Sequence, residues 1–299
     1  MRTSELFDRA LGAYLGLAIG DALGATVEFM TPREIRQRYG VHREITGGGW
    51  LKLRAGQVTD DTTMSLALGD ALLHGRRSGV GFDTRLIADA YAAWWRGRPV
   101  DCGNTCRRGI QRYLFDGSLQ GPVNDGDAGN GALMRCLPAL LATLDDDAVF
   151  ESVALAQARI THHNPLSDAA VLGVGRLLRL QLQGGDAVAS TVLVDAFVAA
   201  HPVFRHRPYP GRASGYVVDT VQTVLHHFAA HADFEDALVA TVNLGDDADT
   251  TGALVGMLAG ARCGVHGLPR RWLARLEPAL VHRITEQTGA LLACALTPV

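Results

Sequence analysis

The stretch Leu11-Gly12-Ala13-Tyr14-Leu15-Gly16-Leu17-Ala18-Ile19-Gly20 crowds small residues into an apolar segment near the start of the chain. Its glycines lower the intrinsic helix propensity, but they also allow the axis of a second helix to approach closely. The apolar residues around them keep helical spacing, with one face formed by Leu6, Phe7, Ala10, Leu11, Tyr14, Leu15 and Ala18. We therefore predict a helix at the centre of the fold.

Helical spacing recurs along the rest of the chain, whereas sustained alternation of apolar and polar residues is scarce. Three further apolar faces consist of Leu86, Ile87, Ala90, Tyr91, Trp94 and Trp95; of Val171, Leu172, Val174, Leu177 and Leu178; and of Val217, Val218, Val221, Val224 and Leu225. No linker and no internal repeat divides the chain. The sequence thus predicts an all-α fold with a single domain over residues 1–299.

Five segments are rich in glycine, proline and polar residues, which favours irregular surface loops over helices. They are residues 31–58, 97–104, 117–131, 161–165 and 202–215. Binding and catalytic residues concentrate on loops that a rigid scaffold holds in place. These loops are therefore where we expect a functional site.

Composition excludes several classes of protein. With 47% apolar and 20% charged residues among 299, the chain is not of the disordered type. Its 28 Lys and Arg against 31 Asp and Glu give a net charge of −3, which leaves no cationic excess for binding nucleic acid. The uncharged stretch from Thr250 to Ala261 is shorter than the ~18 residues of a membrane span, and the N-terminus lacks an apolar signal core. We expect a cytoplasmic protein.

Cysteine, lysine and motif usage narrow the chemistry further. The five cysteines are odd in number and include no Cys-x-x-Cys pair, so reduced thiols are expected. Lys52 is the only lysine, which excludes a phosphate loop ending in Gly-Lys-Ser/Thr. A Gly-x-Ser-x-Gly elbow, a His-Glu-x-x-His pair and a full Gly-x-Gly-x-x-Gly fingerprint are absent from the sequence as well. The pair His226-His227 is interpreted as structural.

Two acidic clusters are the most informative feature. Thr59-Asp60-Asp61-Thr62 and Gly245-Asp246-Asp247-Ala248-Asp249-Thr250 each precede an apolar helical pattern. Either cluster alone is explained by helix capping and by the affinity of acids for the positive end of a helix dipole. Both together supply carboxylates with an adjacent threonine hydroxyl, and such oxygen ligands suit Mg²⁺, Mn²⁺ or Ca²⁺. If the two helix starts converge so that four carboxylates meet at one point, about two divalent cations are needed to neutralise their repulsion, and we predict a dinuclear site.

Three more segments are candidates for the same site. Glu28 is an acid in mostly apolar company, and Asp101-Cys102-Gly103-Asn104-Thr105 places an acid and small polar side chains at an expected helix start. The segment from Gly126 to Arg135 is a glycine-rich loop expected to run into a helix, a geometry that can offer backbone N–H groups and a helix dipole to phosphate. Each of them also has an ordinary explanation when taken alone. Glu28 fits a surface carboxylate, the segment from Asp101 fits a helix cap, and the glycine-rich segment fits a common turn before a helix.

Together these motifs resemble the ADP-ribosylglycohydrolase family over nearly the whole chain. The resemblance rests on six ordered segments: Gly20-Asp21-Ala22-Leu23-Gly24 with Glu28, Thr59-Asp60-Asp61-Thr62, Asp101-Cys102-Gly103-Asn104-Thr105, Asn130-Gly131-Ala132-Leu133-Met134-Arg135, Thr161-His162 and Asp247-Ala248-Asp249-Thr250. It implies an orthogonal all-α bundle with two Mn²⁺ or Mg²⁺ ions in a cleft. The metal ligands it implies are Thr59, Asp60, Asp61, Asp247, Asp249 and Thr250. Asp246 is left out, because relatives often have glycine there.

The resemblance also implies a reaction, the hydrolysis of the bond between ADP-ribose and a modified side chain. We assign Asp101 as acid/base and Glu28 as its partner or as water activator; a direct displacement and a route through an opened ribose ring both remain compatible. The substrate-binding residues expected are Gly103, Asn104, Thr105, Gly129, Asn130, Gly131, His162 and Tyr216. Tyr216 has a core position as its alternative, since it starts an apolar helix.

Within the family the chain most resembles members that act on the nitrogenase iron protein. This implies arginine-linked ADP-ribose on dinitrogenase reductase as substrate, a PII-type signalling protein as regulatory partner and a monomeric enzyme. Two alternatives stay open: a hydrolase for ADP-ribosyl-serine or free ADP-ribose derivatives, and a non-catalytic binding or structural protein.

Overall fold

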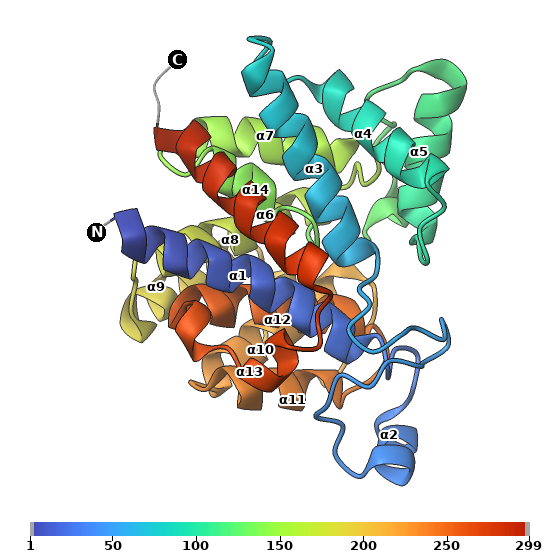
Figure 1. Cartoon of the computed structure of the whole chain (residues 1–299), viewed down its shortest axis with the longest axis vertical. Helices are drawn as coiled ribbons and strands as arrows, with labels where there is room; N and C mark the ends of the chain where they lie inside the picture. Colours follow the sequence, from blue (N-terminus) through green and yellow to red (C-terminus); the bar gives the residue numbers. More distant parts are fainter. Residues whose placement is uncertain (1–2, 297–299) are drawn as a thin grey trace.

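The computed structural model describes residues 3–296, and two glycine-rich helices pack together at its centre (Figure 1). Helix α1 (Thr3–Gly24) lies along α12 (Ala248–Cys263) for most of its length. A Cβ atom added at Gly20 would lie 2.0 Å from the carbonyl oxygen of Gly252, and one at Gly16 would lie 2.2 Å from that of Gly256. Only glycine permits this contact, which confirms the predicted central helix.

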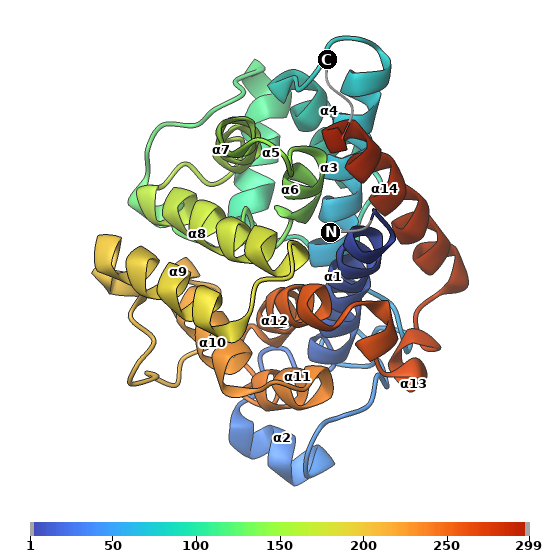
Figure 2. The same ribbon diagram turned by 90° about the vertical axis from the view of Figure 1, so that its left-hand side faces the viewer.

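The other helices surround this pair. Figure 2 shows α14 on one side of α1 and α12, and α8, α9 and α10 on the other. The helices are α2 (Pro32–Tyr39), α3 (Asp60–Arg77), α4 (Thr84–Arg96), α5 (Asn104–Asp116), α6 (Leu137–Ala142), α7 (Asp147–Arg159), α8 (Pro165–Leu182), α9 (Ala187–Ala200), α10 (Val217–Ala230), α11 (Phe234–Val242), α13 (Arg270–Leu273) and α14 (Pro278–Leu296), with short 3₁₀ turns at Asp125–Asp127, Pro202–Phe204 and Val265–Gly267. Over residues 3–296 the fold is all-helical without a strand, as predicted.

The buried apolar side chains form one connected cluster, which extends from Leu6 in α1 to Ala295 in α14. Both central helices contribute to it and also contact α3 and α8, so their ends are held by neighbours from both halves of the sequence. The five cysteines are all free thiols, as expected. None of the helices within residues 3–296 is long and apolar enough to cross a bilayer. The assignment of residues 1–299 to a single domain stays a prediction.

One expectation for loops is wrong. Residues 31–58 include α2, which starts with a capping box in which the Thr31 hydroxyl accepts from the Glu34 N–H while the Glu34 carboxylate accepts from the Thr31 N–H. Because α2 buries only Ile35, apolar spacing gives almost no signal for it. The glycine-rich loop does lead into a helix: turns follow Asn130, and α6 begins at Leu137.

Candidate functional site

The first acidic cluster lies at the start of α3, and Asp21 of α1 holds it there. The Asp21 carboxylate accepts hydrogen bonds from the Thr59 N–H (2.9 Å) and hydroxyl (3.0 Å) and from the Thr62 N–H (3.2 Å) and hydroxyl (2.5 Å). The Thr59 side chain makes no capping bond of its own to the helix. Asp21 therefore caps α3 from a distance of 38 residues along the chain, and this role was not predicted from the sequence.

The second cluster lies at the start of α12 and meets the first, as the dinuclear hypothesis requires. The Thr250 hydroxyl donates to Asp61 Oδ2 (3.3 Å), which joins the two helix starts. The carboxylates of Glu28, Asp247 and Asp249 each place an oxygen within 4.8 Å of the others. Glu28 lies more than 200 residues before Asp247 and Asp249 in the sequence, so the packing of α1 against α12 is what brings these carboxylates together.

The electrostatics of the cluster are those of acids that lack a counter-charge. Burial raises the pKa of Glu28 to about 8 and that of Asp60 to about 7, and the carboxylate of Asp101 adds to both rises. Burial followed by neighbouring carboxylates also holds the pKa values of Asp61 and Asp249 well above their usual range. Asp61 Oδ1 is buried and has no hydrogen-bond partner. Hard divalent cations would supply both the missing charge and the missing partner.

Asp101 lies on the loop that leads into α5, beside the cluster. It is half-buried, burial raises its pKa, and its Oδ1 accepts from the Cys102 N–H (2.7 Å). Two residues on, the Gly103 N–H donates to Asp60 Oδ2 (3.1 Å) and fastens this loop to the start of α3. The loop therefore brings a partly solvated carboxyl group next to buried ones, an arrangement suited to proton transfer.

A cleft of about 570 Å³ opens over the acids. Most of the predicted site residues line it, namely Glu28, Asp60, Asp101, Gly103, Asn104, Thr105, Gly129, Asn130, Gly131, His162, Asp247, Asp249 and Thr250. Thr59 and Asp61 are buried beside these residues and do not line the cleft. Tyr216 does not line it either: its side chain is 43% exposed, and its backbone pairs with Gly129 at the rim. Tyr216 is thus not a core residue.

The far end of the cleft combines a glycine-rich turn with polar side chains. The Asn130 amide donates to Asp247 Oδ2 and to the Thr220 hydroxyl (3.0 Å), which ties the turn to the second acidic cluster. The His162 ring is buried 2.7 Å from the Thr161 hydroxyl, and burial followed by the charge of Arg135 holds its pKa well below the usual range. This end of the cleft therefore offers neutral hydrogen-bonding groups.

Sequence reasoning missed two aromatic residues at the near end of the cleft. Trp50 Nε1–H donates to Glu28 Oε2 (2.7 Å), and Phe29 stacks at a tilt on Trp50 with ring centroids 5.3 Å apart. The adjacency of Phe29 to Glu28 was a signal, but nothing in the sequence links Trp50 to either residue. Asp246, which was left out of the ligand set, has a φ of 54°, a conformation that favours glycine.

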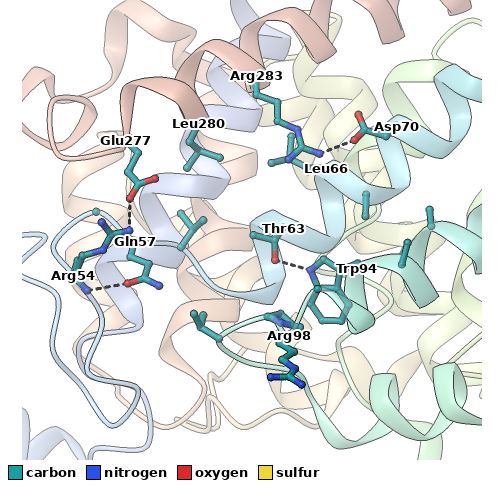
Figure 3. A pocket seen from close by; sticks show the side chains of 18 residues that line it. Arg54, Gln57, Thr63, Leu66, Asp70, Trp94, Arg98, Glu277, Leu280 and Arg283 are labelled. Carbon is teal, nitrogen blue, oxygen red and sulfur yellow. Dashed lines mark hydrogen bonds and ion pairs between the residues drawn. The ribbon is translucent and has the colours of Figure 1, made fainter.

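A second hollow of about 670 Å³ lies between α3, α4 and α14 and shares no lining residue with the cleft (Figure 3). Both of its acids are paired with an arginine, Glu277 with Arg54 (2.7 Å) and Asp70 with Arg283 (2.6 Å), and Trp94 Nε1–H donates to the Thr63 hydroxyl (3.0 Å). None of the predicted site residues lines this hollow. The acids of this hollow are thus paired with arginines, unlike the acids of the cleft.

Comparison with known proteins agrees with this geometry. The family model described as ADP-ribosylglycohydrolase matches residues 2–297. The ADP-ribosyl-[dinitrogen reductase] glycohydrolase of Rhodospirillum rubrum is 54% identical over 295 residues, which cover 99% of both chains. The ADP-ribosylarginine hydrolase Tri1 of Pseudomonas putida (strain GB-1) is 34% identical over 91% of this chain and 75% of its own. A solved ADP-ribosylglycohydrolase-related protein complex superposes with a TM-score of 0.85 at 36% identity, covering 98% of this chain and 100% of that one.

Proposed function

Because the chain belongs to the ADP-ribosylglycohydrolase family, we propose that it hydrolyses the N-glycosidic bond between ADP-ribose and an arginine side chain of a modified protein. The observation that carries the proposal is the cleft in which Asp101 lies beside a cluster of buried carboxylates. The similarity to the ADP-ribosylarginine hydrolase of Pseudomonas putida (strain GB-1) supports arginine-linked ADP-ribose. The Rhodospirillum rubrum relative, at 54% identity, further supports dinitrogenase reductase as the modified protein. A PII-type regulator, a monomeric state and a cytoplasmic location stay predictions.

The donor set fits two divalent cations, Mn²⁺ or Mg²⁺. The residues that would hold them are Thr59, Asp60, Asp61, Asp247, Asp249 and Thr250, with Glu28 beside them. Support comes from the buried and unpartnered Asp61 Oδ1 and from the raised pKa values of acids whose ionised forms burial disfavours. When bound, the cations would neutralise these acids, orient the ribose hydroxyls and activate water.

We place the substrate in the cleft with its ADP-ribose toward the glycine-rich turn. The backbone of Gly129 and Gly131 in the turn and the short polar side chains of Asn104 and Thr105 would face the diphosphate and ribose, while the Asn130 N–H is held by the Gly215 carbonyl oxygen (3.2 Å). His162 lines the same end as a neutral ring, and Tyr216 borders it from the rim. The reacting C1′ atom of the ribose would then lie over the carboxylates.

Hydrolysis breaks the bond between C1′ and a guanidino nitrogen and joins C1′ to a water oxygen. The water loses one proton to a carboxylate, and the leaving nitrogen gains one from a carboxyl group, so that ADP-ribose and arginine are released. We assign these transfers to Asp101, with Glu28 as its partner, because both carboxyl groups line the cleft. The surrounding carboxylates stabilise the oxocarbenium-like charge that develops on the sugar. A route through an opened ribose ring uses the same groups.

A release assay tests the proposal. The purified protein is chelated and incubated with an arginine-ADP-ribosylated protein, with and without added Mn²⁺, and free ADP-ribose is measured. We expect release only with the metal. Release from a serine-linked substrate alone would overturn the arginine assignment but keep the hydrolase. Bound metal without release from either substrate would favour a non-catalytic role.

A further inference from the structure

The cleft does not end at Glu28 but continues into a second groove. This groove, of about 610 Å³, shares Glu28, Phe29 and Trp50 with the cleft and extends to α2, where Glu34, Gln37 and Arg38 line it. The Phe29–Trp50 pair thus lies at the boundary between the cleft and this groove. A substrate that is held in the cleft and continues past Glu28 must pass these two rings.

Both rings are exposed to solvent. Phe29 is 63% and Trp50 51% exposed, although the two are in contact with each other. Trp50 also holds the Glu28 carboxylate through Nε1–H. Large aromatic side chains left open beside an acidic site are typical of surfaces that bind another molecule.

The backbone holds the rings in this exposed position. Phe29 has a φ of 60° and Asp246 a φ of 54°. Both values lie in the left-handed region, which residues other than glycine rarely adopt. Their segments are joined by hydrogen bonds from the Phe29 N–H to the Asp246 carbonyl oxygen (2.7 Å) and from the Asp246 N–H to the Met30 carbonyl oxygen (2.9 Å). On the Trp50 side, a Cβ at Gly49 would lie 2.4 Å from the Ala25 carbonyl oxygen. The pair is therefore preorganised.

The direction of the substrate decides what reaches the pair. If ADP-ribose occupies the end with Gly129 and His162, the bond to be cut lies over the carboxylates and the leaving arginine lies beyond them, at Phe29 and Trp50. A guanidinium group is attracted to the face of an aromatic ring, and the apolar stem of arginine packs on it. The groove offers this part of the substrate the carboxyl groups of Glu28 and Glu34 and the guanidinium group of Arg38, which lies over the ring of Tyr39.

We propose that Phe29 and Trp50 form the platform for the modified arginine, and that the groove toward α2 receives the polypeptide flanking it. The proposal rests on the proposed function, because it takes the protein-linked arginine as the leaving group. It assigns specificity for a protein substrate to residues that do not contact ADP-ribose.

Steady-state kinetics on Phe29→Ala test the platform. For an arginine-ADP-ribosylated protein we expect KM to rise about tenfold, the size of a moderate interface contact, with kcat changed less than twofold. Inhibition by free ADP-ribose should be unchanged, because that product lacks the arginine. Phe115→Ala is the matched control, since Phe115 is 90% exposed and lines neither the cleft nor the groove. Phe29→Tyr, which keeps the ring, should retain the wild-type KM and guards against misfolding.

The outcomes separate the two proposals. An unchanged KM in Phe29→Ala, or a KM rise matched by an equal loss of inhibition by ADP-ribose, overturns the platform while the hydrolase stands. A wild-type protein that releases no ADP-ribose from any arginine-linked substrate overturns the proposed function and the platform with it. Trp50→Phe keeps an aromatic ring but lacks the N–H group that donates to Glu28. It should lower kcat while leaving KM for the protein substrate near the wild-type value.

Discussion

Two hollows of similar size flank one loop of this protein and differ in how their polar groups are satisfied. Residues 97–100 line the hollow between α3, α4 and α14, and residues 101–107 line the acidic cleft. In the first, each acid faces an arginine, as in Arg283–Asp70. In the second, acids lie beside acids, and Asp61, which is buried next to the cleft, has an Oδ1 atom without a hydrogen-bond partner. The volumes of the two hollows do not distinguish them, but the buried charge without a counter-charge does. Burying an unpaired charge costs stability unless a ligand of opposite charge binds to it.

Removing an acid from the cleft should have the largest effect. Asp249→Ala takes away one carboxylate of the cluster with Glu28 and Asp247, and we expect loss of bound metal and a fall in turnover of more than about 10⁴-fold, beyond what one general acid supplies. Metal content by elemental analysis and ADP-ribose release measure this. Asp246→Gly is the control, because Asp246 is exposed at a φ that suits glycine; it should keep its metal. Unchanged metal content in Asp249→Ala would refute the dinuclear site.

Asp101→Ala should impair the reaction without removing the metal. The side chain is half-buried at the edge of the cluster and accepts only from the Cys102 N–H among its described contacts. We expect a loss of about 10² to 10⁴-fold in kcat, the contribution of one general acid or base. The measurement is kcat with metal content and melting temperature monitored alongside. Retained turnover in a folded, metal-loaded variant would remove Asp101 from the mechanism.

The stability of the metal-free protein should fall as pH rises, and the stabilisation that bound metal adds should grow. Burial raises the folded-state pKa values of Asp60 to about 7 and Glu28 to about 8, above the 3.8 and 4.5 of exposed groups. Folding therefore takes up protons, and the chelated protein should lose stability as pH rises from about 4 to 8. Mn²⁺ at 100 times its dissociation constant should restore about 2.7 kcal/mol.

Denaturant unfolding at pH 5 and pH 8, with chelator and with Mn²⁺, measures this dependence. The chelated protein should be the more stable at pH 5, and added Mn²⁺ should stabilise it more at pH 8 than at pH 5, where protons compete for the ligands. A chelated protein that gains stability toward pH 8 would contradict the idea that the cluster lacks counter-charge.

The smallest effect should come from a change in the hollow between α3, α4 and α14, where the acids are paired with arginines. Arg283→Ala removes an ion pair whose side chains are both more than half exposed, so we expect a loss of less than about 1 kcal/mol in the free energy of unfolding. Asp70 keeps a hydrogen bond from Gln287 Nε2 (2.7 Å) in that variant. ADP-ribose release should stay within twofold of wild type. A large loss of release would show that this hollow takes part in function and would break the comparison.

Much of the helical scaffold was predictable, because its signals are local. The spacing of Val171, Val174 and Leu178 marks α8, and the acids at Asp60 and Asp249 mark two helix starts. Helix α2 escaped prediction because it buries one residue and is specified by a capping box instead of an apolar face. Periodicity detects helices that bury a stripe and overlooks short ones that do not.

The sequence by itself determined the all-α class, the glycines that let α1 and α12 meet, and the acids, amides and loops that supply the site. Only the tertiary structure decided which of them meet. The bond from Thr250 to Asp61 joins residues 189 apart, and that from Asn130 to Asp247 joins residues 117 apart. Likewise, Asp21 caps a helix that begins 38 residues along the chain, and Trp50 bonds to Glu28 from 22 residues away, with α2 between them. Such contacts depend on how closely helix axes approach, and that is set by packing over the whole core.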